Sequence, residues 1–214
     1  MTTGHGAEPG REAAVSADTW IEVARRSHDD LAGEVSRLDD EALTRTSGSR
    51  DWDVAQVLGH LGSQAEIGAA ALQAALGERA PLEPDFNPRV WARWNALGRR
   101  DKADGFLRHS DAVTRRYEEL DPETRTSLRI DLGFLPRPAD LATVISLRLN
   151  ELALHAWDVK VANDPAATLL APATSLLIDR FGALIGFIGH AEALGSRAAT
   201  IRVETTDPQR SFGI

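Results

Sequence analysis

The stretch PADLATVISLRLNELALHAWDVKVAN, residues 138–163, predicts a long helix whose inward face carries charge. At about 100° per residue, its apolar side chains repeat along one stripe, as expected of a helix packed on a core. That stripe contains Leu141, Val144, Ile145, Leu152 and Val159. Arg148, Glu151 and His155 fall on the same stripe, although charged groups normally occupy the solvated side of a helix. Because a buried carboxylate needs a partner, this face predicts either a structural polar cluster or a functional site.

Two observations bear on that choice. Glu151 and His155 are spaced i, i+4, so their side chains can converge on one point. A further histidine, His60, lies in the apolar segment VLGHLG, residues 57–62. Its two flanking glycines each lower helix propensity by about 1 kcal/mol relative to alanine, and we expect them to clear space around the imidazole. His60 lies roughly 100–120° from the strongest apolar stripe of its own helix, so its position leaves open whether it faces the interior.

Two imidazoles and one carboxylate would form a three-ligand metal site. His60, Glu151 and His155 are the donors in this hypothesis. The set suits Zn²⁺ with an open fourth position, and the same donor types form the facial triad of non-haem iron. We therefore expect one divalent ion, with zinc as the first choice and nickel or iron as alternatives. The structural alternative is a buried cluster of Arg148, Glu151 and His155 that ties the helices together.

The rest of the chain predicts an all-α protein built on a four-helix bundle. Expected helices cover residues 16–37, 53–78, 87–120 and 138–163, the third with a flaw near Gly98 or Gly105. Ser16 and Asp53 are suitable N-caps for the first two helices. Residues 123–137 are expected to be extended and turn-like. The bundle would therefore occupy residues 16–165, after a disordered terminus over residues 1–15.

Residues 166–214 predict an additional C-terminal helix, over 175–194, followed by a single strand in AATIRVETT, residues 198–206. A lone strand leaves its backbone groups unpaired. We therefore expect either a homodimer that pairs this strand with a second copy, or the remnant of a shortened α/β region.

Composition excludes several classes of function. The formal net charge of −8 argues against a nucleic-acid surface, which needs a basic stripe. The absence of cysteine excludes disulfides, thiolate metal sites and a cysteine nucleophile. No apolar run is long enough for a membrane span, and the first fifteen residues lack the apolar core of a signal peptide. These features predict a soluble cytoplasmic protein with no nucleic-acid or membrane partner.

Two motifs resemble the mycothiol-dependent maleylpyruvate isomerase family, part of the wider DinB-like group of metalloenzymes. They are DWDVAQVLGHLG, residues 51–62, and RLNELALHAWDV, residues 148–159. The resemblance implies a DinB-like bundle whose metal ligands are His60, Glu151 and His155. The other matching positions are Trp52, Val54, Arg148, Trp157 and Asp158, together with the pair Trp94-Asn95. The family usually continues into a C-terminal α/β domain that helps to form the thiol or substrate site.

The resemblance also implies a thiol-dependent enzyme. Because the chain has no cysteine, the sulfur would arrive on a small cosubstrate, and mycothiol is the thiol that the family implies. A metal-activated thiolate could isomerise a small cis-enedioyl acid such as maleylpyruvate, or remain attached to a small electrophile in an S-transferase. The alternative is a non-catalytic, metal-binding helical bundle that acts in ligand sensing or dimerisation.

Three further polar residues each allow two interpretations. Arg148 is the predicted catalytic anchor for a substrate carboxylate, with an ion pair to Glu151 or Asp158 as the alternative. Asp158 could orient an imidazole or simply face another helix. Gln64 lies one turn after His60 and could bind a ligand, although a solvated surface position is the simpler expectation.

Overall fold

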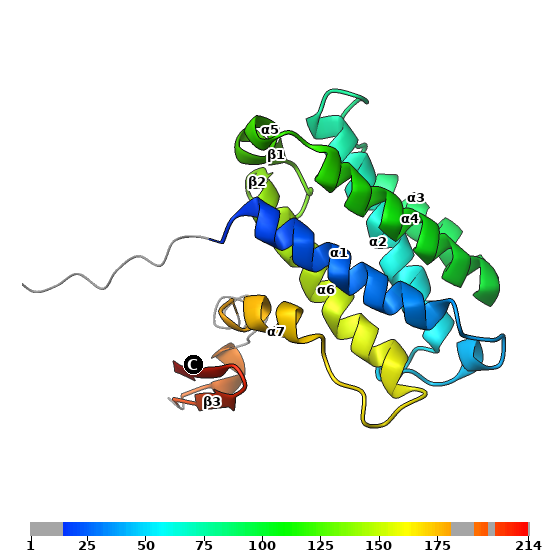
Figure 1. Cartoon of the computed structure of the whole chain (residues 1–214). Helices are drawn as coiled ribbons and strands as arrows, with labels where there is room; N and C mark the ends of the chain where they lie inside the picture. The colour runs from blue at the N-terminus through cyan, green and yellow to red at the C-terminus, as the bar shows by residue number, and fades with distance from the viewer. Residues whose placement is uncertain (1–14, 181–190, 197–199, 214) are drawn as a thin grey trace, which may run out of the picture.

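The computed structural model describes residues 15–180, 191–196 and 200–213, and it is mainly helical. The helices are α1 Ala17–Val35, α2 Val54–Ala75, α3 Phe86–Asn95, α4 Arg99–Glu119, α5 Pro122–Ser127, α6 Leu141–Val161 and α7 Ala171–Ile178, with single 3-10 turns η1 at Ala42–Thr44 and η2 at Ala191–Leu194. The four long helices α1, α2, α4 and α6 form a bundle, in which α2 packs along α4 and α1 along α6 (Figure 1). The predicted helical bundle is confirmed. None of the described helices is both long and apolar enough to cross a membrane.

Side-chain caps fix where three of the bundle helices begin. The Ser16 hydroxyl accepts a hydrogen bond from the backbone N–H of Thr19 at the start of α1. Asp53 forms a reciprocal capping box with Gln56 at the start of α2. Both predicted caps are confirmed. At the start of α6, the Asp140 side chain accepts a hydrogen bond from the backbone N–H of Thr143. This helix therefore begins at Leu141 rather than at the predicted Pro138. Each cap satisfies an N–H that the first helical turn would otherwise leave unpaired.

The helix expected over residues 87–120 is two helices, and the break lies at Gly98, one of the two positions where a flaw was expected. The chain breaks after Asn95, and Gly98 serves as the N-cap of α4. The break lets α3 fold back so that the Trp94 indole packs against Gly62 of α2 and Gly105 of α4. A Cβ atom built on Gly62 would lie 2.2 Å from the Trp94 ring, and one on Gly105 would lie 2.7 Å from it. The indole therefore fits only because both helices carry glycine there.

Other local expectations also need correction. The glycines around His60 do not clear space for its imidazole, because Gly62 adjoins Trp94 and Gly59 adjoins the aliphatic part of Lys102. The segment expected to be extended over 123–137 contains the short helix α5, which Asp121 caps. Two short antiparallel strands follow, β1 Arg129–Ile130 and β2 Ala139–Asp140, and they lead directly into α6.

The prediction of a single C-terminal strand is wrong. Strand β3, Arg202–Thr206, pairs antiparallel with β4, Gln209–Gly213, and Val203 lies opposite Phe212. The backbone groups of β3 thus find a partner within the same chain, which removes the reason for expecting a second copy there. Of the predicted fifth helix, α7 covers Ala171–Ile178, and residues 181–190 lie outside the described part. The predicted disordered terminus likewise lies outside it, except for residue 15.

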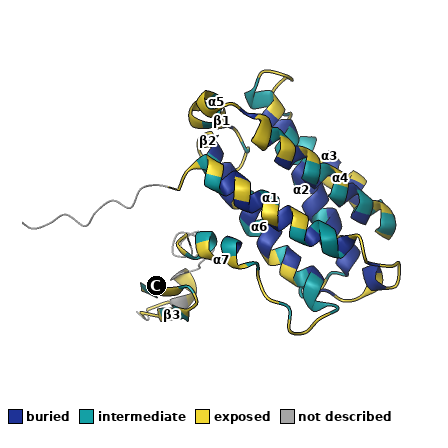
Figure 2. Cartoon of the chain, viewed as in Figure 1, coloured by how far each residue is buried: buried dark blue, intermediate teal, exposed yellow. Residues whose placement is uncertain are grey.

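The core consists of two clusters of buried apolar side chains along the bundle axis. One gathers the first half of α6, including Leu141, Ile145 and Leu149, with α1, α2 and α4. The other gathers its second half, including Leu152 and Val159. Buried residues therefore line the inward faces of the long helices, while exposed residues lie on their outer faces (Figure 2). The polar residues of α6 lie where these two clusters meet.

Candidate metal centre

Helices α2 and α6 bring His60, Glu151 and His155 together. The His60 Nε2 atom lies 3.1 Å from Oε2 of Glu151, and His155 Nε2 lies 3.7 Å from the same oxygen. One ligand atom from each residue lies within 4.8 Å of the others. All three side chains are partly buried, and no other group of this kind occurs among the described residues. The convergence arises because one turn of α6 places Glu151 and His155 side by side while α2 packs across them.

The geometry fits a small divalent ion. Zinc binds imidazole nitrogen and carboxylate oxygen at ~2.0–2.1 Å, so neighbouring ligands in a tetrahedron lie ~3.4 Å apart. The two distances to Glu151 bracket that value. The pKa of Glu151 is lowered from 4.5 to about 2, chiefly by the hydrogen bond with His60, against the opposing effect of burial. The carboxylate is therefore ionised at neutral pH, as a metal ligand must be.

Neighbouring groups fix the orientation of the two imidazoles. The Nδ1 atom of His155 lies 2.7 Å from Oδ2 of Asp158, which directs Nε2 toward Glu151. The Trp52 ring lies 5.2 Å from the His60 ring and 6.1 Å from the His155 ring, between centroids. The backbone carbonyl oxygen of Asp158 accepts a hydrogen bond from the backbone N–H of Gly48. A carboxylate that holds the distal nitrogen of an imidazole in this way fixes its tautomer.

Gln64 belongs to the site, contrary to the expectation of a solvated surface residue. Its Nε2 atom donates a hydrogen bond of 2.9 Å to Oε2 of Glu151 and lies 3.0 Å from Nε2 of His60. Its Oε1 atom lies 3.4 Å from Nη1 of Arg148. Gln64 therefore connects the candidate ligands to the neighbouring guanidinium. The i, i+4 spacing from His60 was the one sequence signal for this role.

Arg148 does not form the expected ion pair with Glu151 or Asp158. Its Nη1 donates to the carbonyl oxygen of Leu61 at 3.1 Å, and its Nη2 donates to the Ser110 hydroxyl at 3.1 Å. No carboxylate among the described residues lies within ion-pair distance of it. Burial lowers the pKa of Arg148 to about 10, so the side chain stays positively charged at neutral pH. An unpaired cation thus lies one helical turn from Glu151.

A buried polar pair lies behind Arg148, and sequence analysis missed it. The Ser110 hydroxyl on α4 accepts from Arg148 and lies 3.0 Å from Nδ1 of His28 on α1. His28 is 4% exposed, and burial lowers the pKa of its imidazole. The neutral ring can accept a hydrogen bond from the Ser110 O–H at Nδ1, which leaves the hydroxyl oxygen to accept a hydrogen bond from Arg148. Residues from three helices therefore hold the guanidinium in place.

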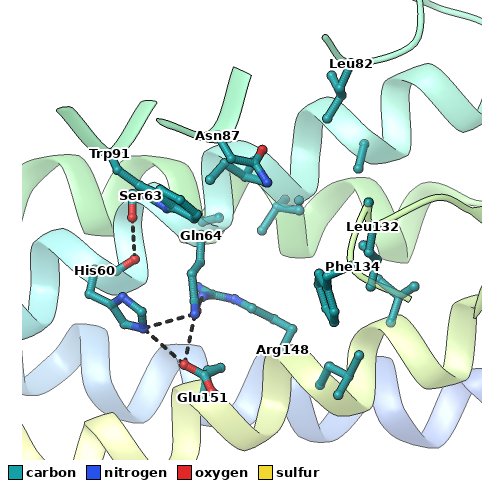
Figure 3. Close-up of a pocket in the computed structure, with 18 of the residues that line it drawn as sticks. His60, Ser63, Gln64, Leu82, Asn87, Trp91, Leu132, Phe134, Arg148 and Glu151 are labelled. Carbon is teal, nitrogen blue, oxygen red and sulfur yellow. Dashed lines mark hydrogen bonds and ion pairs between the residues drawn. The ribbon is translucent and has the colours of Figure 1, made fainter. Parts of the chain in front are cut away.

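Two of the candidate ligands, His60 and Glu151, line a pocket of about 1450 Å³ between α2, α4, α6 and the β1–β2 loop, whereas His155 is not part of its lining. His60, Gln64, Arg148 and Glu151 line it, and their polar atoms point toward one another at one side (Figure 3). Pockets for drug-sized ligands typically measure ~300–1,000 Å³. The space is therefore large enough for more than one small molecule.

The fold and the site define a class of proteins: helical bundles in which two histidines and a glutamate converge beside a pocket as candidate ligands of a single metal ion. Within that class, this chain belongs to the family described as the mycothiol maleylpyruvate isomerase N-terminal domain, which matches residues 24–160. The resemblance seen in the two sequence motifs is thus confirmed. No curated protein matches the chain.

Two solved structures share the fold. One is the mycothiol-dependent maleylpyruvate isomerase, and the other is a mutant of it with one histidine replaced by alanine. The TM-score is 0.56 for each, at 15% and 14% sequence identity. Each match covers 68% of this chain and 61% of the other, so this chain spans about three fifths of the length of these relatives. At this identity the likeness establishes the fold.

Proposed function

We propose that the protein is a metal-dependent enzyme with mycothiol as its thiol cosubstrate, acting as a cis–trans isomerase of the maleylpyruvate type or as an S-transferase. The observation that carries this proposal is the convergence of His60, Glu151 and His155, of which His60 and Glu151 line a large pocket. Membership of the family supports the choice of thiol. The donor set favours zinc, with nickel or iron as alternatives.

The residues present account for the activation of a thiol. A divalent ion held by the three side chains would supply an open coordination position that binds a thiol and lowers its pKa. Glu151 contributes one negative charge, so the site would keep a net positive charge that favours a thiolate. Asp158 fixes the orientation of His155, and Gln64 holds Glu151. Because the chain has no cysteine, the sulfur must come from the cosubstrate.

The two reactions share a first step. The thiolate sulfur forms a bond to one carbon of a double bond conjugated to a carbonyl, and the π electrons move onto the carbonyl oxygen. In the isomerase the resulting single bond rotates, the electrons return, and the carbon–sulfur bond breaks to release the trans isomer and the thiolate. In the transferase the carbon–sulfur bond remains and a proton from water neutralises the adjacent carbon. Arg148 would hold a carboxylate of the electrophile through its unpaired charge.

The alternative of a non-catalytic bundle for sensing or dimerisation has lost one of its two motives. One motive was an unpaired strand, and β3 pairs with β4 of the same chain. The other was the expectation of a shortened C-terminal region. The convergence of three candidate metal ligands favours the enzyme.

Metal analysis and thiol consumption test the proposal together. We expect about one divalent ion per chain in purified protein, and loss of that ion in His155→Ala. His109→Ala is the matched control, because His109 packs on Trp94 away from the three candidate ligands. With the metal bound, mycothiol and an activated cis-enedioyl acid should react. The thiol should be regenerated at each turnover if the protein is an isomerase, and consumed if it is an S-transferase. A protein that binds no metal, or that retains it equally in both variants, would refute the proposal.

A further inference from the structure

The pocket changes from polar to apolar along α2. The side chains that line it begin with His60 and Gln64 at the candidate metal centre. They continue with Ile67 and Ala71, which are apolar. At 1.5 Å per residue, the distance from His60 to Ala71 is ~16 Å along the helix axis. One wall of the pocket therefore offers ligand atoms at one end and hydrocarbon at the other.

The opposite wall, on α6, changes in the same direction. Glu151 lies at the metal end, Arg148 lies one turn away, and Val144 lies one turn beyond that. The contacts of Gln64 with both Glu151 and Arg148 fix the register of α6 against α2. The two helices therefore present their polar residues at the same end. Figure 3 shows Arg148 between the His60–Glu151 side and the side where the loop residues Leu132 and Phe134 lie.

Two residues with unpaired hydrogen-bond donors, Arg148 and Tyr117, lie at the boundary between these ends. The hydrogen bonds of Arg148 use Nη1 and one N–H of Nη2, which leaves Nε–H and the other N–H of Nη2 without a partner among the described residues. Tyr117 on α4 is 3% exposed and lines the pocket, and no hydrogen bond of its hydroxyl occurs in the described part of the chain. Both Arg148 and Tyr117 line the pocket.

These donors suit a carboxylate. Adjacent N–H groups of a guanidinium bind both oxygens of a carboxylate at once, and a tyrosine hydroxyl adds a third hydrogen bond. Burial raises the pKa of Tyr117 to about 12, against the opposing effect of the Arg148 charge, so its hydroxyl keeps its proton. Arg148 lacks a carboxylate partner from the protein, so an incoming anion would meet an uncompensated positive charge.

The apolar end of the pocket carries large apolar side chains that are exposed to solvent. Phe134 is 65% exposed, and Leu147 is 37% exposed, although both line the pocket. Exposed apolar side chains gathered around one pocket are typical of a binding site for apolar groups. The other arginine of the lining, Arg129, uses its Nη1 atom to bind the carbonyl oxygens of Thr126, Ser127 and Leu128. Its Nε and Nη2 atoms form no hydrogen bond among the described residues, so this exposed guanidinium beside the β1–β2 loop could meet a second anionic group.

We propose that the second substrate of this protein is a carboxylic acid with a hydrocarbon group. Its carboxylate binds Arg148 and Tyr117, and its hydrocarbon lies among Ile67, Ala71, Leu132, Phe134, Val144 and Leu147. The assignment of this molecule as a substrate rests on the proposed thiol chemistry, whereas its binding does not. An acid without a hydrocarbon group would leave the apolar end empty.

Octanoate is the probe for this inference, because it has the carboxylate and the hydrocarbon but no electrophilic carbon. We expect isothermal titration calorimetry on the metal-loaded protein to show octanoate binding at least about tenfold more tightly than propionate. Arg148→Met and Tyr117→Phe should each weaken octanoate binding at least about tenfold. Removal of the metal by a chelator should leave octanoate binding unchanged.

A pair of glycine variants separates filling of the pocket from damage to the fold. A Cβ atom on Gly68 of α2 would lie 3.8 Å from the Tyr117 hydroxyl, in ordinary contact, so Gly68→Leu extends into the pocket. Gly33 of α1 is also helical and meets only the end of Arg37, outside the pocket. Both changes favour the helix. Gly68→Leu should abolish octanoate binding, and Gly33→Leu should retain it. Both variants should have a thermal stability equal to or higher than that of the unaltered protein.

The outcomes of the octanoate experiments are distinguishable from those of the metal and thiol experiments that test the proposed function. Octanoate binding that is absent, equalled by propionate, dependent on the metal, or unaffected by Gly68→Leu would overturn this inference. Loss of thiol chemistry with intact octanoate binding would instead overturn the proposed function alone.

Discussion

The Nε2 atom of His60 lies 3.1 Å from Oε2 of Glu151, although the two residues are 91 positions apart in the chain. This contact joins α2 to α6 at the point where the pocket begins. It also lowers the pKa of Glu151, so the carboxylate is ready to bind a cation.

Replacement of Glu151 by Gln should remove metal binding without unfolding the protein. The amide keeps the size of the side chain and a hydrogen bond to Gln64, but it removes the negative charge that a divalent ion requires. We expect the metal content, measured by elemental analysis, to fall at least about tenfold. Glu66→Gln is an unsuitable control because Glu66 binds Trp94, whereas Glu123→Gln changes an exposed carboxylate remote from the site. Equal metal content in Glu151→Gln and Glu123→Gln would contradict the ligand assignment.

Asp158→Asn should weaken metal binding while leaving all three candidate ligands in place. The carboxylate of Asp158 holds Nδ1 of His155, and partners of this kind typically contribute ~10–100-fold to metal affinity. Competition with a chromophoric chelator would measure the change. Asp164→Asn, at an exposed turn after α6, should bind metal as the unaltered protein does. An unchanged affinity in Asp158→Asn would mean that His155 needs no such support.

Gly62→Ala should destabilise the bundle because its Cβ atom would lie 2.2 Å from the Trp94 ring. Overpacking of this kind typically costs ~1–3 kcal/mol. Gly33→Ala adds a methyl group to a helix without a close neighbour and should stabilise it by ~0.5–1 kcal/mol. Urea denaturation of the two variants measures both changes in the free energy of unfolding. If Gly62→Ala were as stable as Gly33→Ala, the packing of Trp94 between α2 and α4 would be wrong.

His28 should make the protein less stable as the pH falls below neutrality. Burial lowers the pKa of His28 below the value of 6.5 that it has in the unfolded chain, so the unfolded state binds its proton first. The free energy of unfolding therefore rises with pH between the folded and unfolded pKa values, by at most ~1.4 kcal/mol per pH unit for one group. The loss of unfolding free energy is absent above pH 6.5, and its pH dependence ends below the pKa that His28 has in the folded protein.

The variant His28→Gln tests that slope. Glutamine has no titratable proton and can still bond to Ser110, so we expect a flatter dependence of unfolding free energy on pH between the two pKa values. His109 also has a pKa lowered by burial, and it should retain its share of the slope in this variant. Parallel curves for His28→Gln and the unaltered protein would show that His28 does not titrate differently on folding.

Local signals in the sequence were sufficient for the bundle. Ser16 and Asp53 mark helix starts because short polar side chains satisfy the first N–H groups of a helix. The strand β4 was missed because QRSFG lacks alternation of apolar and polar residues. The Asp207-Pro208 pair before it was a turn signal that could have revealed the hairpin.

The sequence by itself determined the helical class, the family motifs and the i, i+4 pairing of Glu151 with His155, because all three depend on residues close together in the chain. Tertiary packing alone decided that His60 meets Glu151, that Gln64 joins them, and that Arg148 binds Ser110 instead of a carboxylate. The physical reason is that helical periodicity sets which residues share a face of one helix, whereas the rotation and register of a neighbouring helix depend on how side chains such as Trp94 fill the space between them.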